Sequence, residues 1–196
     1  MECNLLTRSR MRERWNRGPG EKQLRGAIVA AFAVLACAAP ALAQSAHVRG
    51  ERGMQDLVDE AARRSPMVRE LIDRLQEKDV TVYVRGRTFP HLDLEGRVAV
   101  LSTVGSHRYL VIELACGRSE LGQMATLGHE LFHALEIAGA PAVVNAETLA
   151  DFYSRIGTKT ADSGGLRRFE TEAAAAAGML ARRQLLLNNT RHGHGT

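Results

Sequence analysis

The chain has very few cysteines. Its 196 residues include only Cys3, Cys37 and Cys116. The first two fall in a segment that we expect to be removed on export, so Cys116 is predicted to stand alone, without an internal disulfide. The domain should then depend on its hydrophobic core, which about 150 residues suffice to build. Cys116 is accordingly expected to be a small buried residue and not a nucleophile.

Aromatic residues and long apolar stretches are also scarce. Phe, Trp and Tyr make up 5% of the chain, which leaves little obvious material for a specificity pocket. The apolar stretch over residues 27–39 is shorter than the roughly 20 residues of a comfortable membrane span. No internal repeat is present. With 45% hydrophobic and 24% charged residues, the composition is that of a globular domain and excludes collagen, coiled coil or disorder of the whole chain.

A basic excess of +4 first suggests a nucleic-acid partner, but the excess lies at one end of the chain. Seven of the 26 Lys and Arg residues and three of the 22 Asp and Glu residues precede residue 44. Nineteen of each sign remain in the other 153 residues, which are therefore neutral. Nucleic-acid binding loses its electrostatic basis, and no nucleic-acid partner is expected.

Residues 1–43 have the three parts of a secretory signal peptide. A basic region is followed by the apolar stretch over residues 27–39. Pro40 then precedes Ala41-Leu42-Ala43, a small-x-small cleavage site, which makes Gln44 the expected mature N-terminus. The protein is thus predicted to be exported to a bacterial periplasm or secreted.

Two alternatives to cleavage remain open at this leader. The apolar stretch could stay as an uncleaved anchor, or Cys37 could be lipidated, since Val34-Leu35-Ala36-Cys37 is an imperfect lipoprotein box. Contact with a membrane is expected only through these features. The basic region is long, so Met11 is an alternative start.

The remainder is predicted to be a single α+β domain. Residues 44–53 are expected to be a flexible lead-in, 54–188 the folded domain and 189–196 a disordered tail. Helical spacing of apolar residues begins at Met54 and again at Pro66, and alternating β-branched residues follow. We expect a small antiparallel sheet packed against later helices, with strands over residues 80–84, 97–103 and 107–114, and helices after Ser119, over 146–156 and from Leu166.

The strongest chemical signal is His129-Glu130-Leu131-Phe132-His133. Residues four apart share a helix face, so both imidazoles can bind one metal ion. Glu130 projects from a neighbouring position, where it can take a proton from a metal-activated water without binding the metal. His129 and His133 are therefore predicted to be metal ligands, most typically of Zn²⁺, and Glu130 to be the general base.

Through HELFH and the preceding strand HRYLVIEL, residues 80–185 resemble the zincin metallopeptidases. The resemblance implies a zincin-like fold, an HExxH active-site helix, and an edge strand that can pair with an extended peptide. The metzincin continuation is absent, because Glu136 and Gly139 occupy its next two motif positions, and the aspzincin GTxxD element is one residue too long here. A gluzincin-like type, with a glutamate as third ligand, is the best match.

Three glutamates are candidates for that third ligand. Glu147, with Asp151 four residues later, resembles the ExxxD helix of thermolysin-like enzymes. Glu170 precedes a run of small residues, which would let its helix approach the HExxH helix closely, and FETEAA resembles the second motif of small uncharacterised exported bacterial zincin-like proteins. Glu172 is the third candidate. We take Glu170 as the predicted ligand.

The sequence therefore predicts an exported zinc metallopeptidase that hydrolyses peptides or proteins. A non-catalytic zincin-like envelope module, which binds a partner or a metal without turnover, is the alternative. Glu136 could orient a ligand histidine, but a solvated ion-pair residue is the more common role at such a position. Tyr153 could polarise a substrate carbonyl, although a surface role is more usual.

Overall fold

The computed structural model describes residues 47–90, 93–163 and 166–192, and they form an α+β fold. The expected signal peptide, with its cleavage and lipidation sites, lies outside these residues. The helices are α1 (Met54–Arg64), α2 (Pro66–Gln76), α3 (Glu120–Ala138), α4 (Ala146–Ile156) and α5 (Glu172–His192). The strands are β1 (Val48–Gly50), β2 (Val80–Arg87), β3 (Gly96–Val104), β4 (His107–Ala115), β5 (Thr158–Ser163) and β6 (Leu166–Glu170).

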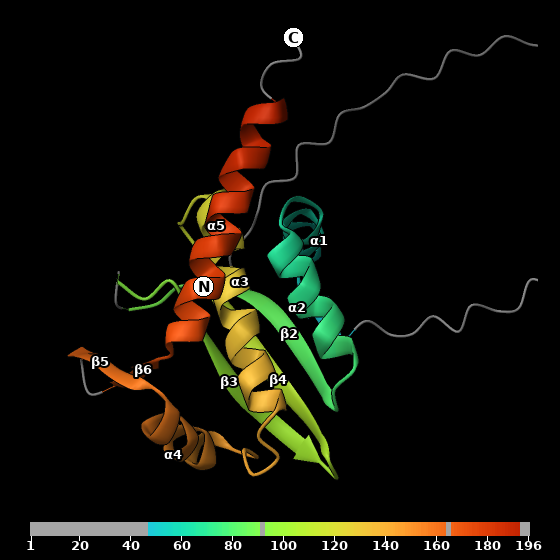
Figure 1. The fold of residues 1–196 in the computed structure, drawn as a ribbon. Coiled ribbons are helices and arrows are strands. Elements are labelled where there is room, and N and C mark those ends of the chain that lie inside the picture. Colours follow the sequence, from blue (N-terminus) through green and yellow to red (C-terminus); the bar gives the residue numbers. More distant parts are fainter. Residues whose placement is uncertain (1–46, 91–92, 164–165, 193–196) are drawn as a thin grey trace, which may run out of the picture. The chain divides into compact units, whose positions relative to one another are not determined.

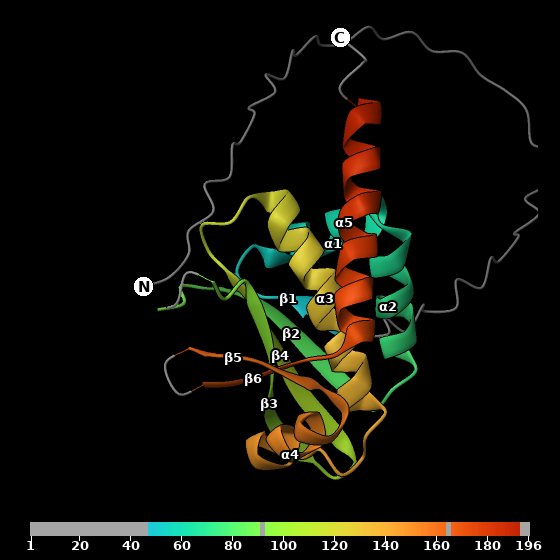
Figure 2. The same ribbon diagram turned by 60° about the vertical axis from the view of Figure 1, so that its left-hand side comes forward.

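Four strands form one mixed sheet in the order β1-β2-β4-β3 (Figures 1 and 2). β1 and β4 each pair in parallel with β2, whereas β3 pairs antiparallel with β4. β3 and β4 form a hairpin with its turn at Gly105-Ser106, but the expected wholly antiparallel sheet is wrong. The error has a physical reason, because a parallel pair joins segments far apart in the sequence and leaves no local turn signal.

One face of the sheet and helices α1, α2 and α3 enclose the core, and α5 packs on α3 from the other side (Figure 2). Residues at alternate positions of β2 and β4 face these helices and are fully buried: Val80, Val82, Val84, Leu110, Ile112 and Leu114. Because side chains alternate along a strand, the intervening residues of β2 and β4 point to the opposite face, away from the helices.

Side-chain hydrogen bonds fix both ends of α3. At its start, which matches the helix expected after Ser119, the Ser119 hydroxyl accepts a hydrogen bond from the Gly122 N–H at 3.2 Å. At its end the buried Arg108 donates to the carbonyl oxygens of Ile137 and Ala138 at 2.6 and 2.9 Å. A guanidinium there satisfies carbonyls that the helix leaves without partners. The helix predicted to carry the site is thus held at both ends.

Small residues let α5 approach α3 closely. A Cβ added to Gly128 would lie 2.7 Å from the Cβ of Ala181, and one added to Gly178 would lie 3.0 Å from the Cβ of His129. Contacts below 3.0 Å are essentially forbidden and those near it are tight. The close approach expected from the run of small residues after Glu170 is thus seen at Gly128, Gly178 and Ala181.

The chain departs from the predicted secondary structure at three places. Val48–Gly50, expected in a flexible lead-in, forms β1, and residues 189–192, expected in the disordered tail, continue α5. The segment from Leu166, expected to start the last helix, forms β6 and pairs antiparallel with β5. Glu170 is therefore the last residue of a strand, and Thr171 caps α5 by accepting a hydrogen bond from the Ala174 N–H at 3.2 Å.

Cys116 is half-buried at the end of β4. The prediction that it stands alone applies to the chain without its leader and stays a prediction, because Cys3 and Cys37 lie outside the described residues. The prediction had assumed removal of Cys3 and Cys37 with the leader. Among the described residues no helix is long and apolar enough to cross a membrane.

Candidate metal centre

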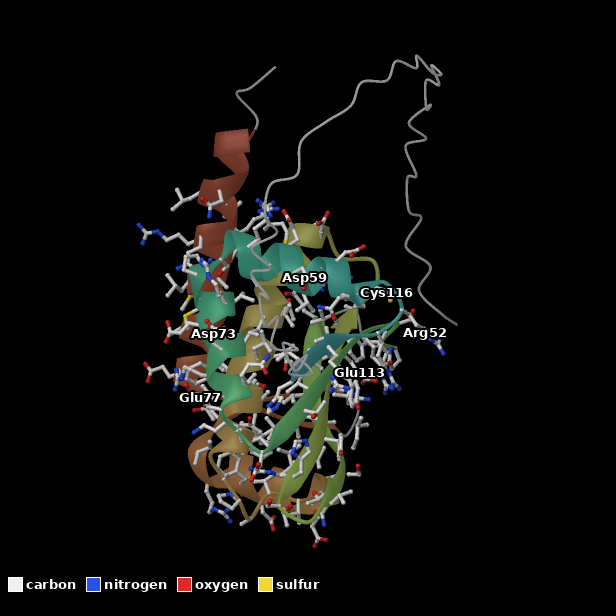
Figure 3. All side chains as sticks on the ribbon, turned by 90° about the vertical axis from the view of Figure 1, so that its right-hand side faces the viewer. Arg52, Asp59, Asp73, Glu77, Glu113 and Cys116 are labelled. Atoms are coloured by element: carbon white, nitrogen blue, oxygen red, sulfur yellow. The ribbon has the colours of Figure 1, made fainter. Side chains whose placement is uncertain are left out.

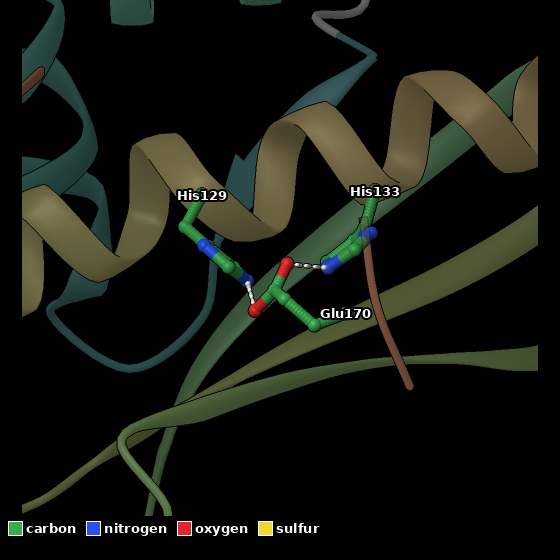
Figure 4. Close-up of side chains that lie close together, drawn as sticks. All are labelled: His129, His133 and Glu170. Atoms are coloured by element: carbon green, nitrogen blue, oxygen red, sulfur yellow. Dashed lines mark ion pairs between the residues drawn. The ribbon is translucent and has the colours of Figure 1, made fainter. Parts of the chain in front are cut away.

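Three of the predicted site residues lie together beside α3 (Figure 4). His129 and His133 project from one face of the helix, and Glu170 reaches between their rings from the end of β6. Its Oε2 lies 3.3 Å from His129 Nε2, and its Oε1 lies 3.6 Å from His133 Nε2. One potential ligand atom from each residue falls within 4.8 Å of the other two.

These distances can be compared with what a metal requires. Two ligand atoms about 2.0–2.1 Å from a tetrahedral ion stand roughly 3.4 Å apart. The two nitrogen–oxygen distances are close to that value, and two imidazoles with one carboxylate form a donor set suited to Zn²⁺. The residues present therefore fit a three-ligand site with a fourth position left for water.

A buried polar network holds the ring of His133 from behind. Its Nδ1 lies 2.8 Å from Glu136 Oε2, and since a carboxylate only accepts, Nδ1 carries the proton. Thr171 donates from Oγ1 to the other oxygen of Glu136 at 2.7 Å, and the Tyr153 hydroxyl lies 3.2 Å from Oε2. Nε2 of His133 consequently faces Glu170, and in the neutral ring its lone pair is available for a metal.

The roles of Glu136 and Tyr153 correct the expectations for both residues. The Glu136 side chain is only 14% exposed and orients His133, so it is not a solvated surface residue. Tyr153 is buried, with its hydroxyl 3.1 Å from His133 Nδ1 and 3.2 Å from Glu136. It is therefore not a surface residue, and it stands behind the histidine, where it supports the ring.

The two histidines titrate in opposite directions. Burial lowers the pKa of His129 below its ordinary value, which favours the neutral form that a metal needs. Burial alone would also lower the pKa of His133, but hydrogen bonds to Glu136 and Glu170 outweigh it and raise that pKa to about 9. Burial opposes ionisation of Glu170, yet the two histidines lower its pKa on balance. Without a metal, protonated His133 thus supplies the positive charge beside Glu170.

Glu130 lies beside this cluster but takes no part in it. It is 5% exposed, and burial raises its pKa to about 7. It has no Lys or Arg partner among the hydrogen bonds and ion pairs of the described residues; His133 lowers its pKa and Glu170 raises it further. A carboxyl group with a pKa near neutrality can both take up and release a proton at physiological pH.

The edge strand β3 passes directly over Glu130. A Cβ added to Gly96, the first residue of β3, would lie 2.9 Å from Glu130 Oε1 and 2.6 Å from Thr126 Cγ2. Glycine is therefore required for the strand to run so close to the carboxylate. Neither glycine nor threonine belongs to a recognisable motif at this point, so the sequence carried no signal for the contact.

The cluster opens into a cleft of about 800 Å³. β3, α3 and α5 line it around Glu130, and α4 contributes apolar residues such as Leu149 near Phe169 of β6. In the described part of the chain β3 pairs only with β4, so its other edge is free, and the first residues of β3 line the cleft. The arrangement offers an extended chain both backbone partners and an acid–base group.

The structure separates the three candidates for the third ligand. Glu170 lies between the histidines, whereas Glu147 is exposed on α4 and Glu172 is exposed at the start of α5. Neither Glu147 nor Asp151 joins His129 and His133 in a possible metal cluster within the described residues. Glu170 was selected partly for the wrong reason, since it ends a strand and does not open the helix.

Comparisons with protein-family models, with curated proteins and with solved structures find no match to this chain. The functional argument consequently depends on the site itself.

Proposed function

We propose that the chain is a zinc-dependent metallopeptidase of zincin type, with a gluzincin-like ligand set. One observation carries the proposal. Glu130 is a buried carboxyl group with a pKa near 7, and it lies between a two-histidine, one-glutamate cluster and the free edge of a strand. A structural carboxylate is normally paired or solvated, whereas this one is available for proton transfer.

His129, His133 and Glu170 would hold the ion. Zinc bound there supplies a Lewis acid that lowers the pKa of water toward about 7 and polarises a scissile carbonyl. Glu136, Thr171 and Tyr153 keep the His133 ring in one orientation with its proton on Nδ1.

Glu130 is the proposed general base and then general acid. Its carboxylate takes the proton of the attacking water and passes it to the departing amine nitrogen. The proximity of Gly96 means that a peptide paired with β3 would bring its backbone near this carboxylate. The proposed substrates are therefore peptides or proteins bound in an extended conformation.

The alternative of a non-catalytic zincin-like module makes a different prediction. Such a module would bind the metal but would not use Glu130 for proton transfer. The cost of burying this unpaired carboxyl group would then have no functional return. Metal analysis of the purified protein and digestion of a mixed peptide library distinguish the two. We expect one zinc per chain and cleavage that a chelator abolishes. Stoichiometric zinc without chelator-sensitive cleavage would favour the module instead.

We also propose export, from the predicted signal at residues 1–43. Expression of the full chain in a bacterium, followed by N-terminal sequencing of the periplasmic fraction, tests it. A mature protein starting at Gln44 is expected, whereas a lipid-modified Cys37 or an intact leader in the membrane fraction would indicate one of the two anchored forms.

A further inference from the structure

Three arginines surround one carboxylate on the face of the sheet opposite the helices. Glu113 projects from β4, three residues before Cys116, and is fully buried (Figure 3). Arg85 and Arg87 of β2 and Arg97 of β3 all donate to it, over distances from 2.5 to 3.0 Å. Its two oxygens are thereby shared among three cations.

The charges in this cluster do not cancel. Three guanidinium groups face one carboxylate, which leaves an excess of two positive charges, and the side chains of Arg85, Arg87 and Arg97 are 40–46% exposed. Arg97 bonds Glu113 through Nε, so its terminal nitrogens retain N–H donors. The guanidinium of Arg97 lies over the ring of Phe89, 5.8 Å from the ring centroid, in a cation–π contact.

Arg97 alone of the three lines the proposed substrate cleft. It follows Gly96 on the edge strand β3, and consecutive side chains of a strand point to opposite faces. A peptide paired with β3 alternates in the same way. Every second residue of such a peptide would point toward Glu130 and α3. The residues between them would point to the opposite face, where the Arg97 side chain lies.

Glu95, an acidic residue close to Arg97 in the sequence, has partners of its own. Glu95, two residues earlier, lies 3.4 Å from Arg118 and 3.5 Å from the Thr126 hydroxyl. A substrate side chain opposite Arg97 therefore meets a guanidinium whose carboxylate partner, Glu113, is already shared among three arginines.

We propose that Arg97 selects peptide substrates with Asp or Glu at the position that faces Arg97. That position is next in the peptide to a residue whose side chain points toward Glu130. The inference rests on the proposed peptidase function and adds the class of substrate. A carboxylate there gains a charge-assisted hydrogen bond without having to displace a strong local ion pair. Since Arg97 is partly exposed, we expect the preference to be about three- to tenfold.

Arg85 provides a matched control. It donates to the same carboxylate and carries the same charge and a similar exposure, but β4 separates its strand from the cleft. Arg97→Gln and Arg85→Gln each remove one of the three cations around Glu113, with the loss of one hydrogen bond at Arg97 and two at Arg85. Only Arg97→Gln removes a cation from the substrate edge.

The experiment uses a peptide that the zinc-loaded protein cleaves, resynthesised with Glu, Gln or Lys at each position around the cleaved bond. We expect one position at which Glu raises kcat/KM about three- to tenfold over Gln and Lys lowers it. Arg97→Gln should remove that preference and Arg85→Gln should retain it. Cleavage with no acidic preference, or a preference that both variants lose equally, would overturn the inference and leave the peptidase function intact.

Failure of the peptidase function would look different, because no peptide would be cleaved. Binding still tests Arg97 in that case. Fluorescence anisotropy of the labelled Glu and Gln peptides on the full-length Glu130→Gln variant should show tighter, salt-sensitive binding of the Glu peptide. A second substitution, Arg97→Gln, should abolish the difference, and equal affinity for both peptides would contradict the proposal.

Discussion

Glu113 and Glu130 are both buried glutamates, yet their surroundings differ completely. Burial alone would raise the pKa of Glu113, but hydrogen bonds from Arg87, Arg85 and Arg97 lower it below the ordinary value. Glu130 has no such cations, and burial raises its pKa to about 7. The comparison separates a carboxylate that stays ionised and links two strands from a carboxyl group with a pKa near neutrality beside the proposed metal ligands.

The largest expected effect on stability comes from removing the charge of Glu113. Glu113→Gln leaves three arginines around a neutral amide and should lower the free energy of unfolding by about 2–3 kcal/mol, between the values for buried and exposed pairs. Glu130→Gln in the metal-free protein relieves the burial of an unpaired acid, so it should change stability by less than about 1 kcal/mol. Urea denaturation measures the free energy of unfolding of both variants. Equal losses of stability would contradict the distinction between Glu113 and Glu130.

A second test concerns the residue that orients His133. Glu136→Ala removes the acceptor at Nδ1 and should weaken zinc binding about ten- to a hundredfold without removing a ligand. Competition with a chromogenic chelator measures the affinity. Glu147→Ala, at an exposed glutamate, is the control and should leave zinc affinity unchanged. Equal effects at both positions would contradict the role of Glu136.

A smaller effect on stability and activity should follow from adding a side chain at Gly96, where β3 passes close to Glu130. Gly96→Ala places a methyl group 2.6 Å from Thr126 and 2.9 Å from the carboxylate. We expect about 1–2 kcal/mol of destabilisation and about tenfold slower cleavage, because the strand must move from the site. At Gly139 an added Cβ meets only ordinary contacts, the nearest at 3.5 Å, so Gly139→Ala should be nearly neutral. Unfolding and kcat/KM measurements on the two variants provide the comparison.

The smallest effect is the acid sensitivity contributed by Glu113. Its folded pKa is lowered, so its contribution is complete above the unfolded value of 4.5 and is lost as the pH falls through the folded value. Between pH 5 and pH 3 the wild type should therefore lose more stability than Glu113→Gln. Denaturation at both pH values tests the sign, and parallel losses would show that Glu113 is not responsible.

Local patterns in the sequence predicted the parts of the fold that depend on local interactions. The spacing of apolar residues and the caps at Ser65, Ser119 and Asn145 define four helices, and the predicted range of α4 matches its bounds. The His129, Glu130 and His133 triad could be placed on one helix face for the same reason. These features need only neighbours a few residues apart.

Features that depend on distant partners could not be predicted in this way. β1 is three residues long and exists through parallel pairing with β2, and β6 resembled the start of the alanine-rich helix that follows it. Glu136 has the sequence context of a surface residue, and only the approach of Thr171 and Tyr153 from later elements makes it an oriented acceptor. Its spacing of three residues from His133 was the one available signal.

The central claim is that Glu130 transfers protons at a zinc site without being a zinc ligand. The most direct measurement is zinc content and peptide cleavage for Glu130→Gln, with circular dichroism to show that the fold is retained. We predict one zinc per chain, as in the wild type, and a loss of kcat of about a hundredfold or more. A variant that keeps its zinc and cleaves peptides at the wild-type rate would contradict the account.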